Sequence, residues 1–135
     1  MIHLDRANPV KLAISAIRAR RQRESGLDSN IYTDKTRLGP VHITVEELRQ
    51  GLFRKKRYEE LKSFVQSLSV PSIHVLYEEL LEELESTLGK IWEFLEVETV
   101  PTETVTRKST PDDLSEAVSN LEELRAAFPE YEKFF

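Results

Sequence analysis

The first apolar positions of the chain form a short run that is followed by a helical stripe. Residues 2–4, Ile-His-Leu, are β-prone and predict a short strand. Asn8 is a favoured N-cap, and Pro9 fits the first helical position because its missing N–H would have no partner inside the helix. One face of this helix is expected to be buried and consists of Val10, Ala13, Ile14 and Ile17. The cations are expected to face water or a ligand: Lys11, Arg18, Arg20, Arg21 and Arg23.

A second amphipathic helix is predicted after a long loop. Turn formers are dense in residues 26–43 and no period is sustained there, which predicts the loop. Thr44 and Glu47 form a capping-box pair at the helix start. The basic run of residues 54–57, Arg-Lys-Lys-Arg, is expected on a solvated face. The buried face is expected to run the whole length of the helix: Val45, Leu48, Leu52, Tyr58, Leu61, Val65 and Leu68.

The second half of the chain repeats the step from strand to helix. Residues 73–77, Ile-His-Val-Leu-Tyr, predict a buried strand, and a helix is expected over residues 81–95. Thr110, Pro111 and Asp113 mark another helix start, with the apolar face Leu114, Ala117, Val118, Leu121 and Leu124. The aromatic tail, residues 128–135, is expected to pack on the body of the domain.

These elements predict a small α/β protein that is mostly helical and has two short parallel strands. Two strand-to-helix units are part of a parallel layer, because parallel strands are joined by helical crossovers. With 135 residues, the chain is long enough for one domain but not for two, so residues 1–135 are expected to form a single domain.

Composition narrows the function classes. The net charge of −5 with 32% charged residues gives no general signature of nucleic-acid binding. The chain has no cysteine, which excludes disulfides and thiolate metal sites and favours a cytoplasmic location; no metal site is expected. No apolar run approaches the roughly 20 residues that a membrane span needs.

The end of the first predicted strand is a candidate anion site. A strand that passes into a helix directs backbone N–H groups and the positive end of the helix dipole at one point, where α/β proteins bind phosphate. Arg6 stands directly before this point. Taken alone, the segment favours an ordinary helix start whose arginines are solvated.

Three blocks of the sequence together resemble one enzyme family. They are DRANPVKLAIS at residues 5–15, VLYEELLEELESTLGKIWEFLEV at residues 75–97 and RKSTPDDLSEAVSNLEELRAAF at residues 107–128. In order and approximate spacing they resemble the C-terminal half of the sulfotransferases that use 3′-phosphoadenosine 5′-phosphosulfate (PAPS), particularly the bacterial branch. The resemblance implies part of a three-layer fold like that of P-loop NTPases. It also implies transfer of a sulfuryl group from PAPS, the co-substrate, to a hydroxyl or amine acceptor.

The resemblance also implies which residues contact the nucleotide. Arg6 and Ser15 match the arginine and serine that hold the 3′-phosphate, and the helix start at Asn8 supplies N–H donors. Arg107 and Lys108 stand where family members often place cations near the nucleotide. The chain departs from the family pattern at Ala7, where the animal and plant enzymes have the arginine, and at Glu96, where a glycine is usual.

Other parts of a sulfotransferase active site are not expected in this chain. The four glycines are isolated, so no Gly-rich loop cradles the 5′-phosphosulfate. His3 and His74 fall in predicted strands, where a satisfied buried histidine is the default, and His42 is expected to be exposed. Glu78 and Glu79 are expected to be surface charges. No catalytic residue is therefore assigned.

The chain is accordingly expected to be the C-terminal portion of a sulfotransferase domain and to be inactive by itself. Its partner would then be the missing N-terminal half or a second copy. The alternative is a non-catalytic interaction module that keeps the α/β scaffold and pairs with another chain through an exposed sheet edge. A helical protein that binds RNA or DNA through residues 18–23 and 54–57 is a weaker third option.

Overall fold

The computed structural model describes residues 1–27, 38–103 and 110–135. The chain divides into two compact units. The strand unit comprises Met1–Ala7 and Tyr58–Glu103, and the helical unit comprises Asn8–Arg57 and Thr104–Phe135. The described residues are mostly helical and contain two short parallel strands, which confirms the coarse fold class.

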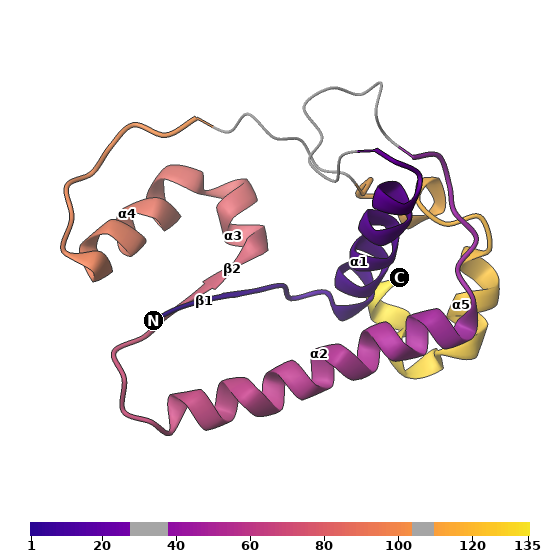
Figure 1. Cartoon of the computed structure of the whole chain (residues 1–135), viewed down its shortest axis with the longest axis horizontal. Helices are drawn as coiled ribbons and strands as arrows, with labels where there is room; N and C mark the ends of the chain where they lie inside the picture. Colours follow the sequence, from indigo (N-terminus) through magenta and orange to yellow (C-terminus); the bar gives the residue numbers. More distant parts are fainter. Residues whose placement is uncertain (28–37, 104–109) are drawn as a thin grey trace. The chain divides into compact units, whose positions relative to one another are not determined.

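The two strands of the strand unit lie side by side and run in the same direction (Figure 1). Strand β1 (Ile2–Asp5) pairs with strand β2 (Ile73–Leu76) in a register that joins Ile2 to Ile73 and Asp5 to Leu76. Strand β2 passes directly into helix α3 (Tyr77–Glu82), which is followed by helix α4 (Leu84–Leu95). The prediction of a buried strand is correct only at Val75, which is 2% exposed; Ile73 and Leu76 are partly buried and His74 is exposed.

The prediction of one continuous helix over residues 81–95 is wrong, because the backbone leaves the helical region at Glu83. Its φ of −133° and ψ of 53° separate α3 from α4. Thr87 stabilises the junction: its hydroxyl donates to the Glu79 carbonyl at 3.3 Å and its N–H to the Glu83 carbonyl at 2.9 Å. The Thr87 side chain is buried in this junction. A polar residue, which the apolar pattern does not include, therefore stabilises the break between α3 and α4.

Helix α4 ends at Glu96, which has a left-handed backbone conformation with φ of 55° and ψ of 39°. The N–H of Val97 donates to the Trp92 carbonyl at 3.1 Å, closing the last turn. Glycine is the residue best suited to this position, since a Cβ in the left-handed region costs about 1–2 kcal/mol.

Replacement of Glu96 by glycine is therefore expected to stabilise the protein by about 1 kcal/mol. Relief of the left-handed strain in the folded state gains more free energy than the larger conformational entropy of glycine in the unfolded state costs. Urea denaturation followed by far-UV circular dichroism measures the change. Glu98→Gly, in the exposed segment after α4, is the matched control. A loss of stability in Glu96→Gly would show that the left-handed end of α4 is not strained.

The helical unit is built from helix α1 (Pro9–Glu24), the first part of helix α2 (Val45–Gln66) and helix α5 (Leu121–Ala127). Both predicted helix starts are confirmed. The Asn8 side chain accepts the Lys11 N–H at 2.8 Å. At the start of α2, the Glu47 carboxylate accepts the Thr44 N–H at 2.9 Å, and the Thr44 hydroxyl accepts the Glu47 N–H at 3.2 Å.

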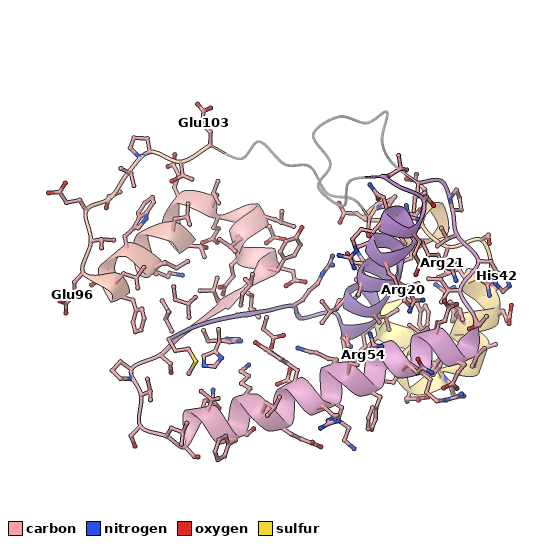
Figure 2. All side chains as sticks on the ribbon, in the orientation of Figure 1. Arg20, Arg21, His42, Arg54, Glu96 and Glu103 are labelled. Carbon is pink, nitrogen blue, oxygen red and sulfur yellow. The ribbon has the colours of Figure 1, made fainter. Side chains whose placement is uncertain are left out.

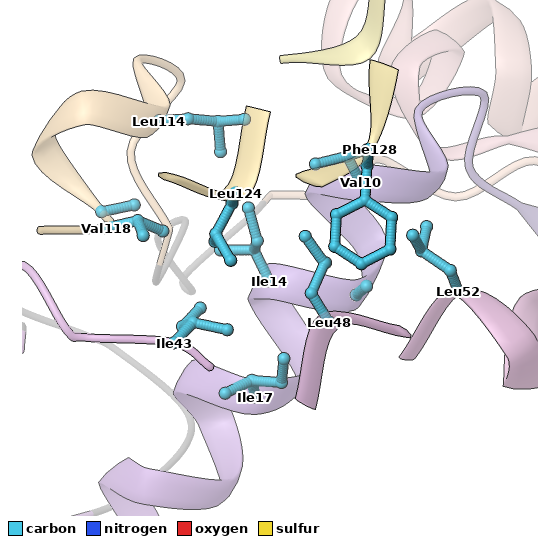
Figure 3. Close-up of a cluster of buried hydrophobic side chains, with 12 residues drawn as sticks. Val10, Ile14, Ile17, Ile43, Leu48, Leu52, Leu114, Val118, Leu124 and Phe128 are labelled. Carbon is cyan, nitrogen blue, oxygen red and sulfur yellow. The ribbon is translucent and has the colours of Figure 1, made fainter. Parts of the chain in front are cut away.

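The core of the helical unit joins the predicted face of α1 to side chains from distant segments (Figure 3). Tyr131, Phe134 and Phe135 of the aromatic tail pack against this core, as predicted. Gly51 of α2 lies so close to α1 that a Cβ at this position would stand 2.8 Å from the Ala13 Cβ. The buried residues are Val10, Ala13, Ile14, Ile17, Ile43, Leu48, Leu52, Leu114, Ala117, Val118, Leu124 and Phe128.

The helix predicted over residues 114–124 is interrupted, and that prediction is wrong. A 3₁₀ turn at Leu114–Glu116 (η2) ends in a bridge between Val118 and Val41, and α5 begins only at Leu121. The Asn120 side chain extends this pairing by accepting the Ile43 N–H at 3.0 Å and donating to the Ile43 carbonyl at 2.9 Å. The apolar positions are buried as predicted, but they belong to two short elements.

Two further corrections concern surfaces. Arg18 was expected to face water or a ligand, yet it is 2% exposed. Helix α2 was expected to bury one face along its whole length, yet its buried residues are Leu48 and Leu52, and Leu61 is 62% exposed. Among the described residues, no helix is long and apolar enough to cross a membrane.

Candidate functional site

Arg6 follows directly after β1 and is held by side chains that follow β2. Its Nε lies 3.7 Å from the Glu78 Oε1, and its guanidinium carbon lies 4.8 Å from the centre of the Tyr77 ring. The Arg6 side chain is 14% exposed. At 3.7 Å the Glu78 carboxylate forms an ion pair but not a hydrogen bond, and the buried Nε has no hydrogen-bond partner among the described residues.

Glu78 also binds the backbone at the same point. Its Oε2 accepts the N–H of Ala7 at 3.1 Å. Parallel pairing places the carboxyl ends of β1 and β2 at one edge, so the residues after the two strands become neighbours. The Glu78 side chain is 34% exposed, so it lies at the surface as expected, but its carboxylate also contacts Arg6 and Ala7.

The two contacts of the Glu78 carboxylate are the kinds of contact that a phosphate would need. A guanidinium supplies charge and N–H donors, and a backbone N–H supplies a directed donor. The adjacent Glu79 has a different task, since its carboxylate accepts the Leu76 N–H at 3.2 Å and caps α3. Arg6 and the Ala7 N–H therefore form a small anion-binding position, which is occupied by the Glu78 carboxylate of the chain itself.

Asn8 and Ser15 belong to the helical unit, whereas Arg6 belongs to the strand unit. The Asn8 amide is fully engaged, because its oxygen caps α1 and its nitrogen donates to the Phe134 carbonyl at 2.8 Å. Ser15 is half-buried in the middle of α1, and its hydroxyl has no hydrogen-bond partner in the part of the chain that the structure describes. Arg107 and Lys108 lie outside the described residues.

A second polar cluster in the strand unit was missed at the sequence level. Nζ of Lys62 on α2 lies 3.3 Å from the Asp5 Oδ2 and 2.9 Å from the His74 Nε2. The His74 side chain is 40% exposed, so the prediction of a buried histidine is wrong. Asp5 and His74 stand on neighbouring strands, and only the register of the parallel pair reveals that Lys62 can bridge them. The cluster joins α2 to the strands of this unit.

The other two histidines differ in their surroundings. His3 is 8% exposed, and its Nε2 lacks a hydrogen-bond partner among the described residues, so the prediction of a satisfied buried ring is wrong at this atom. His42 is exposed, as predicted, and its backbone carbonyl accepts a hydrogen bond from Arg21. Figure 2 labels both residues. In the described ranges, no group of three or more His, Cys, Asp or Glu residues could hold a metal ion.

Two cations near the end of α1, Arg20 and Arg21, are bound to an acid. Arg20 and Arg21 each donate to the Glu47 carboxylate, at 2.9 Å and 2.8 Å. Partial burial raises the pKa of Glu47, but the Thr44 N–H and the Arg21 guanidinium outweigh it and hold the pKa below its ordinary value. Ionised Glu47 of α2 therefore links this helix to Arg20 and Arg21 of α1.

Comparisons of the chain with protein-family models, with curated proteins and with solved structures give no match.

Proposed function

We propose that the chain is a sulfotransferase-like protein that binds the 3′-phosphate of PAPS at the carboxyl end of β1. The observation that carries this proposal is the Glu78 carboxylate, which lies between the Arg6 side chain and the Ala7 N–H. A nucleotide 3′-phosphate would take the position of this carboxylate and use the same two donors.

Two features of the strand unit support the proposal. Strands β1 and β2 are parallel neighbours whose ends meet at one edge, which is where α/β proteins bind nucleotides. Glu96 stands where the resemblance places a glycine, and its backbone is in the left-handed region that favours glycine. Asn8, Ser15, Arg107 and Lys108 stay in the proposal as further nucleotide contacts.

The proposed chemistry is divided between this chain and a partner. Transfer of the sulfuryl group breaks the bond from sulfur to the bridging oxygen of PAPS and forms a bond from sulfur to the acceptor oxygen or nitrogen. A base must remove the acceptor proton, and no residue of the described ranges is assigned this role. The chain would contribute the 3′-phosphate anchor, and the 5′-phosphosulfate loop and the base would come from the partner.

Binding of adenosine 3′,5′-bisphosphate tests the anchor. Arg6→Ala is expected to weaken binding about tenfold or more, because a charge-assisted hydrogen bond contributes roughly 1.5–3 kcal/mol. Adenosine 5′-monophosphate, which has no 3′-phosphate, should bind equally to the wild type and to Arg6→Ala. Isothermal titration calorimetry measures all four combinations.

Two further variants sharpen this experiment. Glu78→Gln removes the competing negative charge at nearly constant volume, so it is expected to bind the bisphosphate several-fold more tightly than the wild type. Lys90→Ala, which removes an exposed cation of α4, should leave binding unchanged. Equal bisphosphate affinities for the wild type, Arg6→Ala and Glu78→Gln would remove Arg6 from the site and overturn the proposal.

A further inference from the structure

Strand β1 has a neighbour on one side only. The sheet of the strand unit has the order β1–β2, so among the described residues no further strand pairs with β1. The Ile73 N–H donates to the Met1 carbonyl at 2.9 Å, and in such a parallel ladder the backbone groups of alternate residues point to the neighbouring strand. The N–H and C=O groups of Ile2 and Leu4 therefore point away from β2. We call this side the free edge of β1.

Apolar side chains accompany these backbone groups. Ile2 and Leu4 lie on the same face of the sheet, because they are two positions apart on a strand, and their side chains are 42% and 52% exposed. Edge strands of soluble proteins are usually protected by a charge, a proline or a bulge. The charged residue of β1 is Asp5, and its Oδ2 lies 3.3 Å from the Lys62 Nζ. The free edge at Ile2 and Leu4 therefore lacks these protections.

The opposite edge of the sheet differs because it is capped. The Leu76 N–H, which points away from β1, donates to the Glu79 carboxylate at 3.2 Å. On β1 the Tyr58 hydroxyl donates to the Leu4 carbonyl at 3.4 Å, which is a long hydrogen bond. A carbonyl oxygen has two lone pairs, so Leu4 can accept a second hydrogen bond. The sheet can therefore be extended at β1.

We propose that β1 of a second copy of this chain pairs antiparallel with the free edge of β1 and continues the sheet across a twofold axis. A second copy is the favoured occupant because the free edge is complementary to itself. When the axis passes between the two His3 residues, Ile2 of each copy stands opposite Leu4 of the other, and such a pair exchanges both of its N–H···O bonds. The Ile2 and Leu4 side chains of both copies then lie on one face and contact each other across the strands.

The inference uses residues of the strand unit alone, and it does not depend on nucleotide binding at Arg6. The pairing occupies the free edge of both copies, so the assembly closes as a dimer. Arg6→Ala, which tests the proposed nucleotide site, is accordingly expected to dimerise like the wild type. The two proposals can therefore fail separately.

Sedimentation velocity of the full chain over a range of concentrations tests the proposal. The wild type is expected to be a reversible dimer. Leu4→Lys places a charge at the apolar contact of both copies, and Ile2→Pro removes an outward N–H without loss of a hydrogen bond to β2. Each should raise the dissociation constant about tenfold or more. Leu81→Lys makes the same change at a leucine of α3 that is 47% exposed, and it should dimerise like the wild type.

A single introduced cysteine reports the register. The chain has no cysteine, so a disulfide in His3→Cys can form only between two copies. The two Cα atoms at this position would be about 4.5 Å apart, as in a pair without mutual hydrogen bonds, and a disulfide spans this distance. Thr102→Cys, in the exposed segment after α4, is the control and should cross-link at least about tenfold more slowly, because this segment is not in the contact.

Far-UV circular dichroism of the variants should match the wild type, which separates association from misfolding. A wild type that is monomeric at every concentration would overturn the proposal. Cross-linking of His3→Cys that is no faster than that of Thr102→Cys would overturn the register. A dimer that Leu81→Lys dissociates and Leu4→Lys leaves unchanged would show that the copies do not meet at β1.

Discussion

Replacement of Arg18 by methionine is expected to lower the free energy of unfolding by about 2–4 kcal/mol. The Arg18 guanidinium is buried in the helical unit and donates to three carbonyls: Leu38 at 2.7 Å, Gly39 at 2.9 Å and Ala117 at 2.6 Å. Hydrogen bonds from a charged donor contribute roughly 1.5–3 kcal/mol each. The variant also avoids the free-energy cost of burying a charge, which offsets part of the lost hydrogen-bond energy. This cost is present in the wild type because the described partners of the guanidinium are carbonyls and not carboxylates.

The pKa of Arg18 has the same physical origin. Burial disfavours the charged form and lowers the pKa of this guanidinium from its ordinary value. The carbonyl oxygens that it contacts belong to segments far apart in the sequence, so the side chain holds residues 38–39 against the segment before Val118. Loss of the donors should therefore loosen the bridge between Val41 and Val118 as well.

Urea denaturation of the Arg18→Met variant, followed by far-UV circular dichroism, measures the loss. Arg18→Lys keeps the charge but has fewer donors in a different geometry, so it should restore only part of the stability. Arg23→Met, on the exposed side of α1, should change the free energy of unfolding by no more than about 0.5 kcal/mol. Equal stabilities for Arg18→Met and Arg23→Met would show that the three hydrogen bonds contribute nothing net.

Replacement of Phe128 by alanine is expected to cost about 3–5 kcal/mol, the largest effect of any substitution considered for this chain. Phe128 is 5% exposed in the core of the helical unit. Its ring meets the Tyr131 ring edge to face, with centroids 6.5 Å apart, and lies 5.8 Å from the Arg49 guanidinium carbon. Truncation would leave a cavity and remove the contact that fixes the aromatic tail.

An exposed phenylalanine, Phe53, is the matched control for this experiment, because its removal changes the same residue type without a change in the core. Phe53→Ala removes an equally large ring that is 60% exposed and should change stability by no more than about 0.5 kcal/mol. The comparison uses the urea midpoints of the two variants under the same buffer conditions. If Phe128→Ala unfolded at the same urea concentration as Phe53→Ala, the aromatic tail would not be part of the stable core.

Local chemistry was sufficient to predict the elements whose ends are set by neighbouring residues. The Asn8 and Pro9 start of α1 and the capping box of Thr44 and Glu47 are short-range hydrogen-bond patterns, and the structure contains both. The two short parallel strands were likewise predicted from β-prone runs followed by helices. The breaks at Glu83 and after η2 were not predictable, because apolar periodicity continues across them while their hydrogen bonds come from Thr87 and from residues 41–43.

The candidate site was only partly predictable. Arg6 was found from its place after a strand, but its partner Glu78 depends on the parallel register, which brings together residues about 70 positions apart. Adjacent acids on a helix give no sign of which one turns toward a distant arginine.

The sequence by itself determined which residues can be apolar faces, caps and strands, because these depend on spacing and on local hydrogen bonds. Only the tertiary structure decided which faces are covered. Leu48 and Leu61 belong to the same predicted stripe of α2, yet one is buried against α1 and the other is exposed. Arg18 shares the cationic pattern of Arg23 but is buried, because carbonyls of distant segments surround its guanidinium. Burial is a property of contacts between distant segments, and no pattern along a single helix contains it.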